Sequence, residues 1–228
     1  MIVMKIGIVR FPGTNNEKES YLSLSQIKDI EPILISSTDP EQLSYCDGVL
    51  LAGGFSYGDY LRTGAIAANS DLILKIVKEI NDENKPIIGI CNGFQILTEA
   101  KLLDGVLLRN QKTRFISKWV NIKVTSKNSF FSRNLEKQIL RMPIAHNEGR
   151  YFHPDVAQLF AEDRVIFQYV DSNGIISNES NPNGSLENIA GITNEAGNVL
   201  GLMPHPDRAS FIHLGSVDGL EILKHFIM

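Results

Sequence analysis

The sequence is poor in cysteine, has no marked excess of charge of either sign, and contains no long apolar run. Its 228 residues include two cysteines, Cys46 and Cys91, too few for a disulfide framework, so we expect two free thiols. The 22 basic and 26 acidic residues are scattered, which argues against nucleic acid or an anionic membrane as a partner. Cysteine and histidine are too few and too separated to predict a metal site.

Membrane insertion and export are not indicated either. The apolar runs are strand-length, far below the roughly 18 residues of a spanning helix. The chain enters a strand-like segment at once, without a signal-peptide pattern. These features predict a cytoplasmic protein.

The most informative segment is Gly89-Ile90-Cys91-Asn92-Gly93. Residues 87–90 form a short apolar run typical of a buried parallel strand, and apolar positions after residue 93 fit one helix face. The pattern G-x-C-x-G is the thiol counterpart of the nucleophile elbow. Such a turn places the cysteine sulfur at a helix N-terminus, where the helix dipole favours a thiolate. The alternative is a small apolar cysteine packed at a strand end.

Strands and helices alternate through the first hundred residues. Strands are predicted at 33–35, 48–52 and 87–90, with a helix over 65–81. The alternation predicts a flavodoxin-like α/β fold: an open, mostly parallel sheet with helices on both faces and ligands at the carboxyl ends of its strands. We expect one domain over residues 1–228.

The second half of the chain has a different pattern. Alternating stretches after residue 105 predict mixed or antiparallel strands that extend the sheet, with hairpin-like turns at 173–174 and 183–184. The polar segment 178–188 is expected to be an exposed loop.

A cysteine nucleophile needs a base, and His205 is the best placed of five histidines. It follows an apolar strand at 199–203 and lies between two prolines that restrict the backbone. Asp207 supplies a carboxylate that can orient the imidazole. The alternative is an ordinary proline-rich surface turn.

A glycine-rich loop follows the strand at 48–52. It lacks the lysine and spacing of a phosphate-binding loop, so a mononucleotide site is not predicted. The backbone N–H groups of Gly54 and of Asn92, the residue after the cysteine, are candidates for an oxyanion hole. The alternative is a tight turn without a ligand.

Taken together, these motifs resemble class I (triad) glutamine amidotransferases, and more narrowly the glutaminase subunits of phosphoribosylformylglycinamidine synthases. The resemblance spans nearly the whole chain in family order and rests on residues 11–15, 53–62, 89–97, 107–110, 143–150, 181–185 and 203–206.

The resemblance implies that Cys91 attacks the side-chain amide of glutamine, that His205 protonates the departing ammonia, and that water hydrolyses the glutamyl thioester. Gly54 and Asn92 would form the oxyanion hole, and Gln95 would help to hold glutamine. Ammonia would pass to a synthase subunit that converts formylglycinamide ribonucleotide, and a third small subunit is a further candidate partner. No cofactor is implied in this subunit, since the synthase uses ATP and magnesium.

Four further residues lie in family-like segments. Arg109, Asn110, His146 and Glu148 are candidates for the glutamine pocket or the partner interface, with local hydrogen bonding in a loop as the alternative.

Two positions depart from the family pattern. Asp207 stands where glutamate is usual, which shortens the reach to His205 by about 1.5 Å and predicts an active but weaker glutaminase. Asn16 stands where cysteine is frequent, and we expect it to lie outside the chemistry. The rival interpretations are a cysteine hydrolase of related fold and a catalytically decayed structural or regulatory subunit.

Overall fold

The computed structural model describes residues 3–227, apart from the side chains of residues 80–83. Its centre is a nine-stranded sheet in the order β2-β1-β3-β4-β11-β10-β9-β6-β7. The first five strands are mutually parallel and the last four are antiparallel to their neighbours. The parallel strands are β1 (Met4–Arg10), β2 (Ile30–Ser36), β3 (Gly48–Leu51), β4 (Ile87–Ile90) and β11 (Val199–Leu202). This arrangement confirms the predicted flavodoxin-like sheet with an antiparallel extension.

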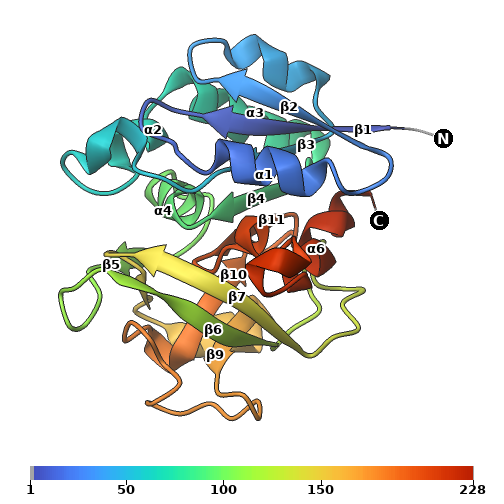
Figure 1. The fold of residues 1–228 in the computed structure, drawn as a ribbon. Coiled ribbons are helices and arrows are strands. Elements are labelled where there is room, and N and C mark those ends of the chain that lie inside the picture. Colours follow the sequence, from blue (N-terminus) through green and yellow to red (C-terminus); the bar gives the residue numbers. More distant parts are fainter. Residues whose placement is uncertain (1–2, 228) are drawn as a thin grey trace.

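The antiparallel half forms the lower part of the molecule in Figure 1. It contains β6 (Ile116–Val124), β7 (Ile139–His146), β9 (Val165–Val170) and β10 (Ile189–Thr193). A separate two-stranded ribbon pairs β5 (Val106–Leu108) with β8 (Arg150–Phe152). The loops at this end reach the carboxyl ends of the parallel strands.

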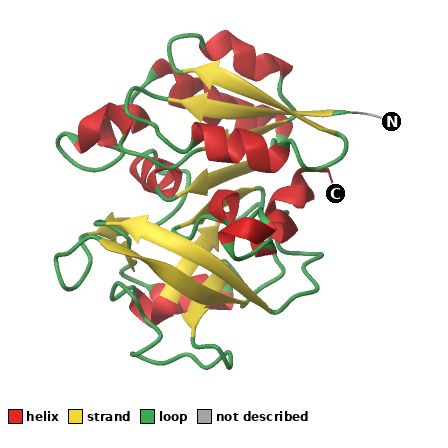
Figure 2. Cartoon of the chain, in the orientation of Figure 1, coloured by secondary structure: helices red, strands yellow, loops and turns green. Residues whose placement is uncertain are grey.

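Helices cover both faces of the parallel half, as Figures 1 and 2 show. On one face α1 (Glu17–Leu24) contacts α6 (Asp218–Leu223), and on the other α4 (Asn92–Glu99) packs on β3, β4 and β11. Every residue of those three strands is buried, which explains their continuous apolar runs. The remaining helices are α2 (Ala65–Ala68), α3 (Asp71–Glu83) and α5 (Val156–Ala161).

The single helix predicted over 65–81 is wrong: α2 ends at Ala68 and α3 begins at Asp71. Asn69 Nδ2 donates to the Ala65 carbonyl, and Ser70 Oγ donates to the Ala67 carbonyl. Asparagine and serine side chains that bond nearby backbone compete with the helical ladder, so the helix stops at this pair.

The turn predicted at 173–174 exists, but it does not join two strands. Asp171 Oδ1 accepts the N–H groups of Asn173 and Ile175, and the next strand begins only at Ile189. The prediction that residues 178–188 form an exposed loop is wrong for part of the segment, because Asn183, Ser185 and Asn188 are buried.

Candidate active site

Cys91 occupies the sharp turn between β4 and α4. Its φ of 52° and ψ of −102° are strained for a residue with a side chain, as in a nucleophile elbow. A Cβ on Gly93 would lie 2.1 Å from the Leu51 carbonyl oxygen, and one on Gly89 would lie 2.7 Å from Gly93 backbone atoms. Only glycine fits at either flank, so close packing of the turn against β3 fixes the thiol in place.

His205 follows β11, the strand beside β4, so the parallel register brings it to the same edge of the sheet as Cys91. Its backbone N–H donates to the Pro143 carbonyl at 2.9 Å. The imidazole is 1% exposed, and its Nδ1 lies 3.1 Å from Asp207 Oδ1. Its other nitrogen, Nε2, has no hydrogen-bond partner among the described residues and is left to face the thiol.

The charge on His205 suits an ion pair with the cysteine. Burial alone lowers the pKa of this imidazole, but the charge and hydrogen bond of Asp207, with a smaller contribution from Cys91, raise it to about 9. The imidazolium is therefore the main form at neutral pH. A neighbouring imidazolium stabilises a cysteine thiolate.

Asp207 reaches His205 despite its short side chain. The turn Pro206–Arg208 brings the carboxylate close, and both residues of the pair are almost fully buried. Helix α1 holds the far side, where Ser20 Oγ donates to Asp207 Oδ2 at 3.3 Å and Ser23 Oγ donates to the Asp207 carbonyl at 2.7 Å. The short carboxylate of Asp207 therefore reaches the imidazole.

The two candidate oxyanion donors flank the thiol. Gly54 has a φ of +143°, and a Cβ there would lie 2.6 Å from the Asn15 nitrogen, so this position requires glycine. Asn92 is the first residue of α4, where backbone N–H groups have no partner within the helix. Its side chain accepts from the Ser56 N–H at 3.2 Å and donates to Gln95 Oε1 at 3.1 Å, which ties the elbow to the glycine loop.

A cavity of about 160 Å³ opens on one side of the thiol. Cys91 and Gln95 form its floor, and the Gln95 amide donates to the Glu148 carbonyl. The Glu148 carboxylate accepts from Thr63 Oγ1 at 2.7 Å and pairs with Arg109 Nε at 3.4 Å. Arg109, Gln95, His146 and Glu148 therefore come together here as predicted, whereas Asn110 is not among the lining residues.

Asp59 is a charged wall residue that sequence analysis missed. Burial, and then the charge of Glu148, raise the pKa of the Asp59 carboxyl to about 6. Its buried Oδ1 has no hydrogen-bond partner among the described residues. The residue is part of the glycine-rich loop, but its direction depends on the positive φ values of Tyr57, Gly58 and Asp59 itself, which composition does not reveal.

Asn110 supports the cavity wall from behind. Its Nδ2 donates to the Arg114 and His146 carbonyls, so its Oδ1 must accept the Nδ1 proton of His146 at 3.0 Å. Asn183 braces the same wall from the 178–188 loop, where its Nδ2 donates to the Gly149 carbonyl at 2.7 Å. These bonds explain why parts of that loop are buried.

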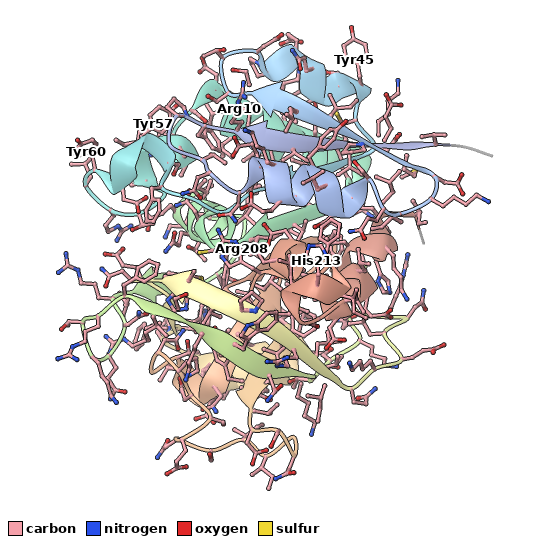
Figure 3. All side chains as sticks on the ribbon, viewed as in Figure 1. Arg10, Tyr45, Tyr57, Tyr60, Arg208 and His213 are labelled. Atoms are coloured by element: carbon pink, nitrogen blue, oxygen red, sulfur yellow. The ribbon has the colours of Figure 1, made fainter. Side chains whose placement is uncertain are left out.

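His146 is expected to make the fold sensitive to acid. Burial, with a contribution from nearby His205, lowers its pKa to about 3. Below pH 6.5 the unfolded chain gains a proton at this residue that the folded chain does not accept until about pH 3, so stability falls as pH drops through that range. In urea unfolding, the free energy of unfolding should fall less between pH 7.5 and pH 5 for His146→Gln than for the wild type. His213→Gln, at an exposed position (Figure 3), is the control. If His146→Gln loses as much stability as the wild type between these pH values, His146 is not the source of the acid sensitivity.

Asn16, which we expected to lie outside the chemistry, lies close to the reactive pair. The side chain is 2% exposed and lies beside His205 and Cys91 in the wall of a second cavity. Its position at the start of α1 gives no local signal of this neighbourhood, because strand order alone brings the first loop to the thiol.

Comparison with known proteins decides the family. Residues 3–216 match the CobB/CobQ-like glutamine amidotransferase domain. The chain belongs to this glutamine amidotransferase family. A phosphoribosylformylglycinamidine synthase subunit PurQ of Saccharolobus solfataricus is 50% identical over 222 residues, which cover 96% of this chain and 97% of that protein. The protein of the same name from Pyrococcus horikoshii is 45% identical over 232 residues, covering 99% and 98%.

Solved structures agree with the amidotransferase assignment. A chain in the structure of PurLQS from Thermotoga maritima is 38% identical, with a TM-score of 0.86 and coverage of 99% of this chain and 98% of that one. A glutamine amidotransferase from Thermotoga maritima shares the fold at 18% identity, with a TM-score of 0.56 and coverage of 91% of this chain and 77% of that one. The resemblance predicted from the motifs is thereby confirmed.

Within residues 3–227 there is no helix of the length and apolar character needed to cross a membrane. Apart from residues 80–83, whose side chains are not described, the same residues contain no group of three or more His, Cys, Asp or Glu side chains arranged to hold a metal ion.

Proposed function

We propose that this amidotransferase is the glutaminase subunit of a phosphoribosylformylglycinamidine synthase, supplying ammonia for purine biosynthesis. The observation that carries the proposal is the strained Cys91 elbow beside the buried His205–Asp207 pair, at the floor of a cavity with charged walls. The names and coverage of the relatives support the same reaction.

The residues of the site fit a two-step hydrolysis. The Cys91 thiolate attacks the glutamine side-chain carbon, and the N–H groups of Gly54 and Asn92 stabilise the oxyanion. Collapse breaks the carbon–nitrogen bond as the His205 imidazolium gives its proton to the leaving ammonia. Water then attacks the thioester and passes a proton to His205, which releases glutamate and restores the cysteine.

The cavity walls match the ends of glutamine. Free glutamine carries an ammonium and a carboxylate, and the cavity offers the Asp59 carboxylate and the Arg109 guanidinium. Asp59 Oδ1 lacks a partner among the described residues, whereas Glu148 is already bonded to Thr63 and Arg109. We therefore assign Asp59 to the substrate ammonium and Arg109 to the substrate carboxylate.

Asp59→Asn should raise the KM for glutamine roughly 10- to 100-fold, the cost of losing a charged hydrogen bond of about 1.5–3 kcal/mol. Ammonia-dependent synthesis should be unchanged. Glutaramate, which lacks the ammonium, should be a much poorer substrate than glutamine for the wild type, and the variant should lose most of that preference. Tyr60→Phe is the matched control, because Tyr60 projects to the outside of the same loop (Figure 3). An undiminished preference for glutamine in Asp59→Asn would refute the assignment.

The partners follow from the same proposal. The protein acts with a synthase subunit that binds ATP and magnesium, and in some forms with a third small subunit, in the cytoplasm. It needs no cofactor of its own. A decayed triad is not favoured, since the Asp207 carboxylate lies 3.1 Å from His205 Nδ1. A cysteine hydrolase that acts on peptides is not favoured, since the family model and the relatives are glutamine amidotransferases.

Reconstitution tests the proposal as a whole. Purified protein mixed with a synthase partner, formylglycinamide ribonucleotide, ATP and glutamine should release glutamate and form formylglycinamidine ribonucleotide in equal amounts. Absence of glutamate from the complete mixture, with ammonia-dependent synthesis intact, would overturn it.

A further inference from the structure

A second cavity, of about 90 Å³, also borders Cys91 and is distinct from the glutamine cavity. The two share Gly54, Phe55, Cys91 and Ala145, but only the second is lined by Asn16 and His205. Arg208 also borders it, and Figure 3 shows this residue at the junction between the parallel and antiparallel halves. Cys91 therefore borders both the cavity assigned to glutamine and a smaller chamber beside His205.

Asn16 is held rigidly in this chamber. Its N–H donates to the Gly53 carbonyl at 3.2 Å, and its carbonyl accepts from Ser20 N–H at 3.0 Å in the first turn of α1. A Cβ on Gly53 would lie 2.8 Å from His205 Cε1 and 3.2 Å from Asn16 Oδ1. The asparagine and histidine side chains thus converge over one glycine.

Two polar atoms in this wall lack partners. Asn16 Nδ2 and His205 Nε2 are buried and have no hydrogen-bond partner among the described residues. A buried polar atom without a partner favours a bound polar molecule, so Asn16 Nδ2 is a site for one beside His205. On this measure one water molecule needs roughly 10–15 Å³, so the chamber has room for water.

We propose that Asn16 is a positioning residue for the water that hydrolyses the glutamyl thioester, an inference that rests on the proposed glutaminase function. Once His205 has given its Nε2 proton to ammonia, that nitrogen is an acceptor while Nδ1 donates to Asp207. The water accepts a hydrogen bond from Asn16 Nδ2 and donates one to His205 Nε2. Its oxygen bonds to the thioester carbon, its proton moves to His205, and the carbon–sulfur bond breaks. The products are the Cys91 thiolate beside an imidazolium and a new γ-carboxyl group, which releases its remaining proton to solvent to give glutamate.

The test separates formation of the thioester from its hydrolysis in the reconstituted complex. Asn16→Leu keeps the volume and removes the amide, and Asn16→Ala is the second variant if the first folds poorly. Both should lower kcat and the KM for glutamine together, by roughly 10- to 100-fold for loss of one positioned hydrogen bond, with kcat/KM little changed. Acid-quenched protein should show the glutamyl adduct on Cys91 by intact mass, and hydroxylamine, which attacks thioesters without a positioned water, should restore turnover.

Asn198→Ala is the control, because Asn198 is a buried asparagine whose amide donates to the Lys85 carbonyl at the opposite ends of the strands. It should show neither the adduct nor rescue by hydroxylamine. A fall in kcat/KM without adduct accumulation would overturn the proposal, as would wild-type kinetics in both Asn16 variants. Normal glutamate release with lost transfer of ammonia to the synthase would also overturn it and would assign the chamber to ammonia. Absence of glutamate from the wild-type complex, with ammonia-dependent synthesis intact, would instead count against the glutaminase function itself.

Discussion

Cys91→Ala is expected to abolish glutamine-dependent synthesis by the complex while ammonia-dependent synthesis continues at the wild-type rate. The thiol is the group that we assign to bond with the glutamine carbon, and removal of a nucleophile costs about six orders of magnitude in kcat in a well-studied protease. The Cys91 side chain is buried at the base of the cavity. Alanine keeps the Cβ atom that cysteine has, so the substitution removes the sulfur without changing the steric demand on the strained backbone. Product formation with glutamine or with ammonium salt as the nitrogen source provides the measurement.

Cys46→Ala is the matched control, since Cys46 is also a buried free thiol but packs near Gly7 of β1, away from both cavities. It should retain both activities. Loss of ammonia-dependent synthesis in Cys91→Ala would mean that the residue supports the fold or the interface. Retention of glutamine-dependent synthesis would exclude it as the nucleophile.

Asp207→Asn is expected to lower kcat for glutamine by roughly three to four orders of magnitude, because an amide neither fixes the correct imidazole tautomer nor stabilises the imidazolium. The pKa of His205 should fall from about 9, since the Asp207 charge is what raises it. The pair's contribution to stability is fully present below pH 6.5 and is lost as pH rises to about 9, because the folded pKa exceeds the unfolded one. In urea unfolding, the free energy of unfolding should therefore fall less between pH 6 and pH 9 in Asp207→Asn than in the wild type.

Asp207→Glu gives the complementary result. The carboxylate is fully enclosed by His205, Ser20 and the turn, so one more methylene overpacks the site and should destabilise the protein by about 1–3 kcal/mol. We expect no gain in activity from the residue that is usual in the family. A marked rise in kcat would show that the aspartate limits catalysis, and full activity in Asp207→Asn would remove the carboxylate from the mechanism.

Local sequence patterns were enough to predict most of the fold and the reactive groups. The apolar run before Cys91, the flanking glycines and the prolines around His205 each determine their own backbone, so their structure could be predicted without knowledge of the rest. The helix break at Asn69 and Ser70 was missed because the apolar spacing continues across it, and only side-chain bonds to the backbone end the first helix.

The parts of the site that were missed depend on long-range contacts. Asp59 faces Glu148, which is 89 positions away, and Asn16 faces His205, because the strand order joins those ends of the sheet. Asn183 is polar and lies in a turn-rich segment, yet it is buried, and its side-chain amide donates to the Gly149 carbonyl. Nothing in the composition of these segments distinguishes such residues from exposed ones.

Labelling of the cysteine tests the central claim most directly. The protein in its complex is treated with a glutamine-like diazoketone, with and without glutamine, and the modified residue is identified by peptide mass spectrometry. We predict one adduct per chain, on Cys91 and not Cys46, that free glutamine suppresses. An adduct at Cys91 that glutamine does not suppress, or equal labelling by peptide electrophiles, would contradict a glutamine-specific nucleophile.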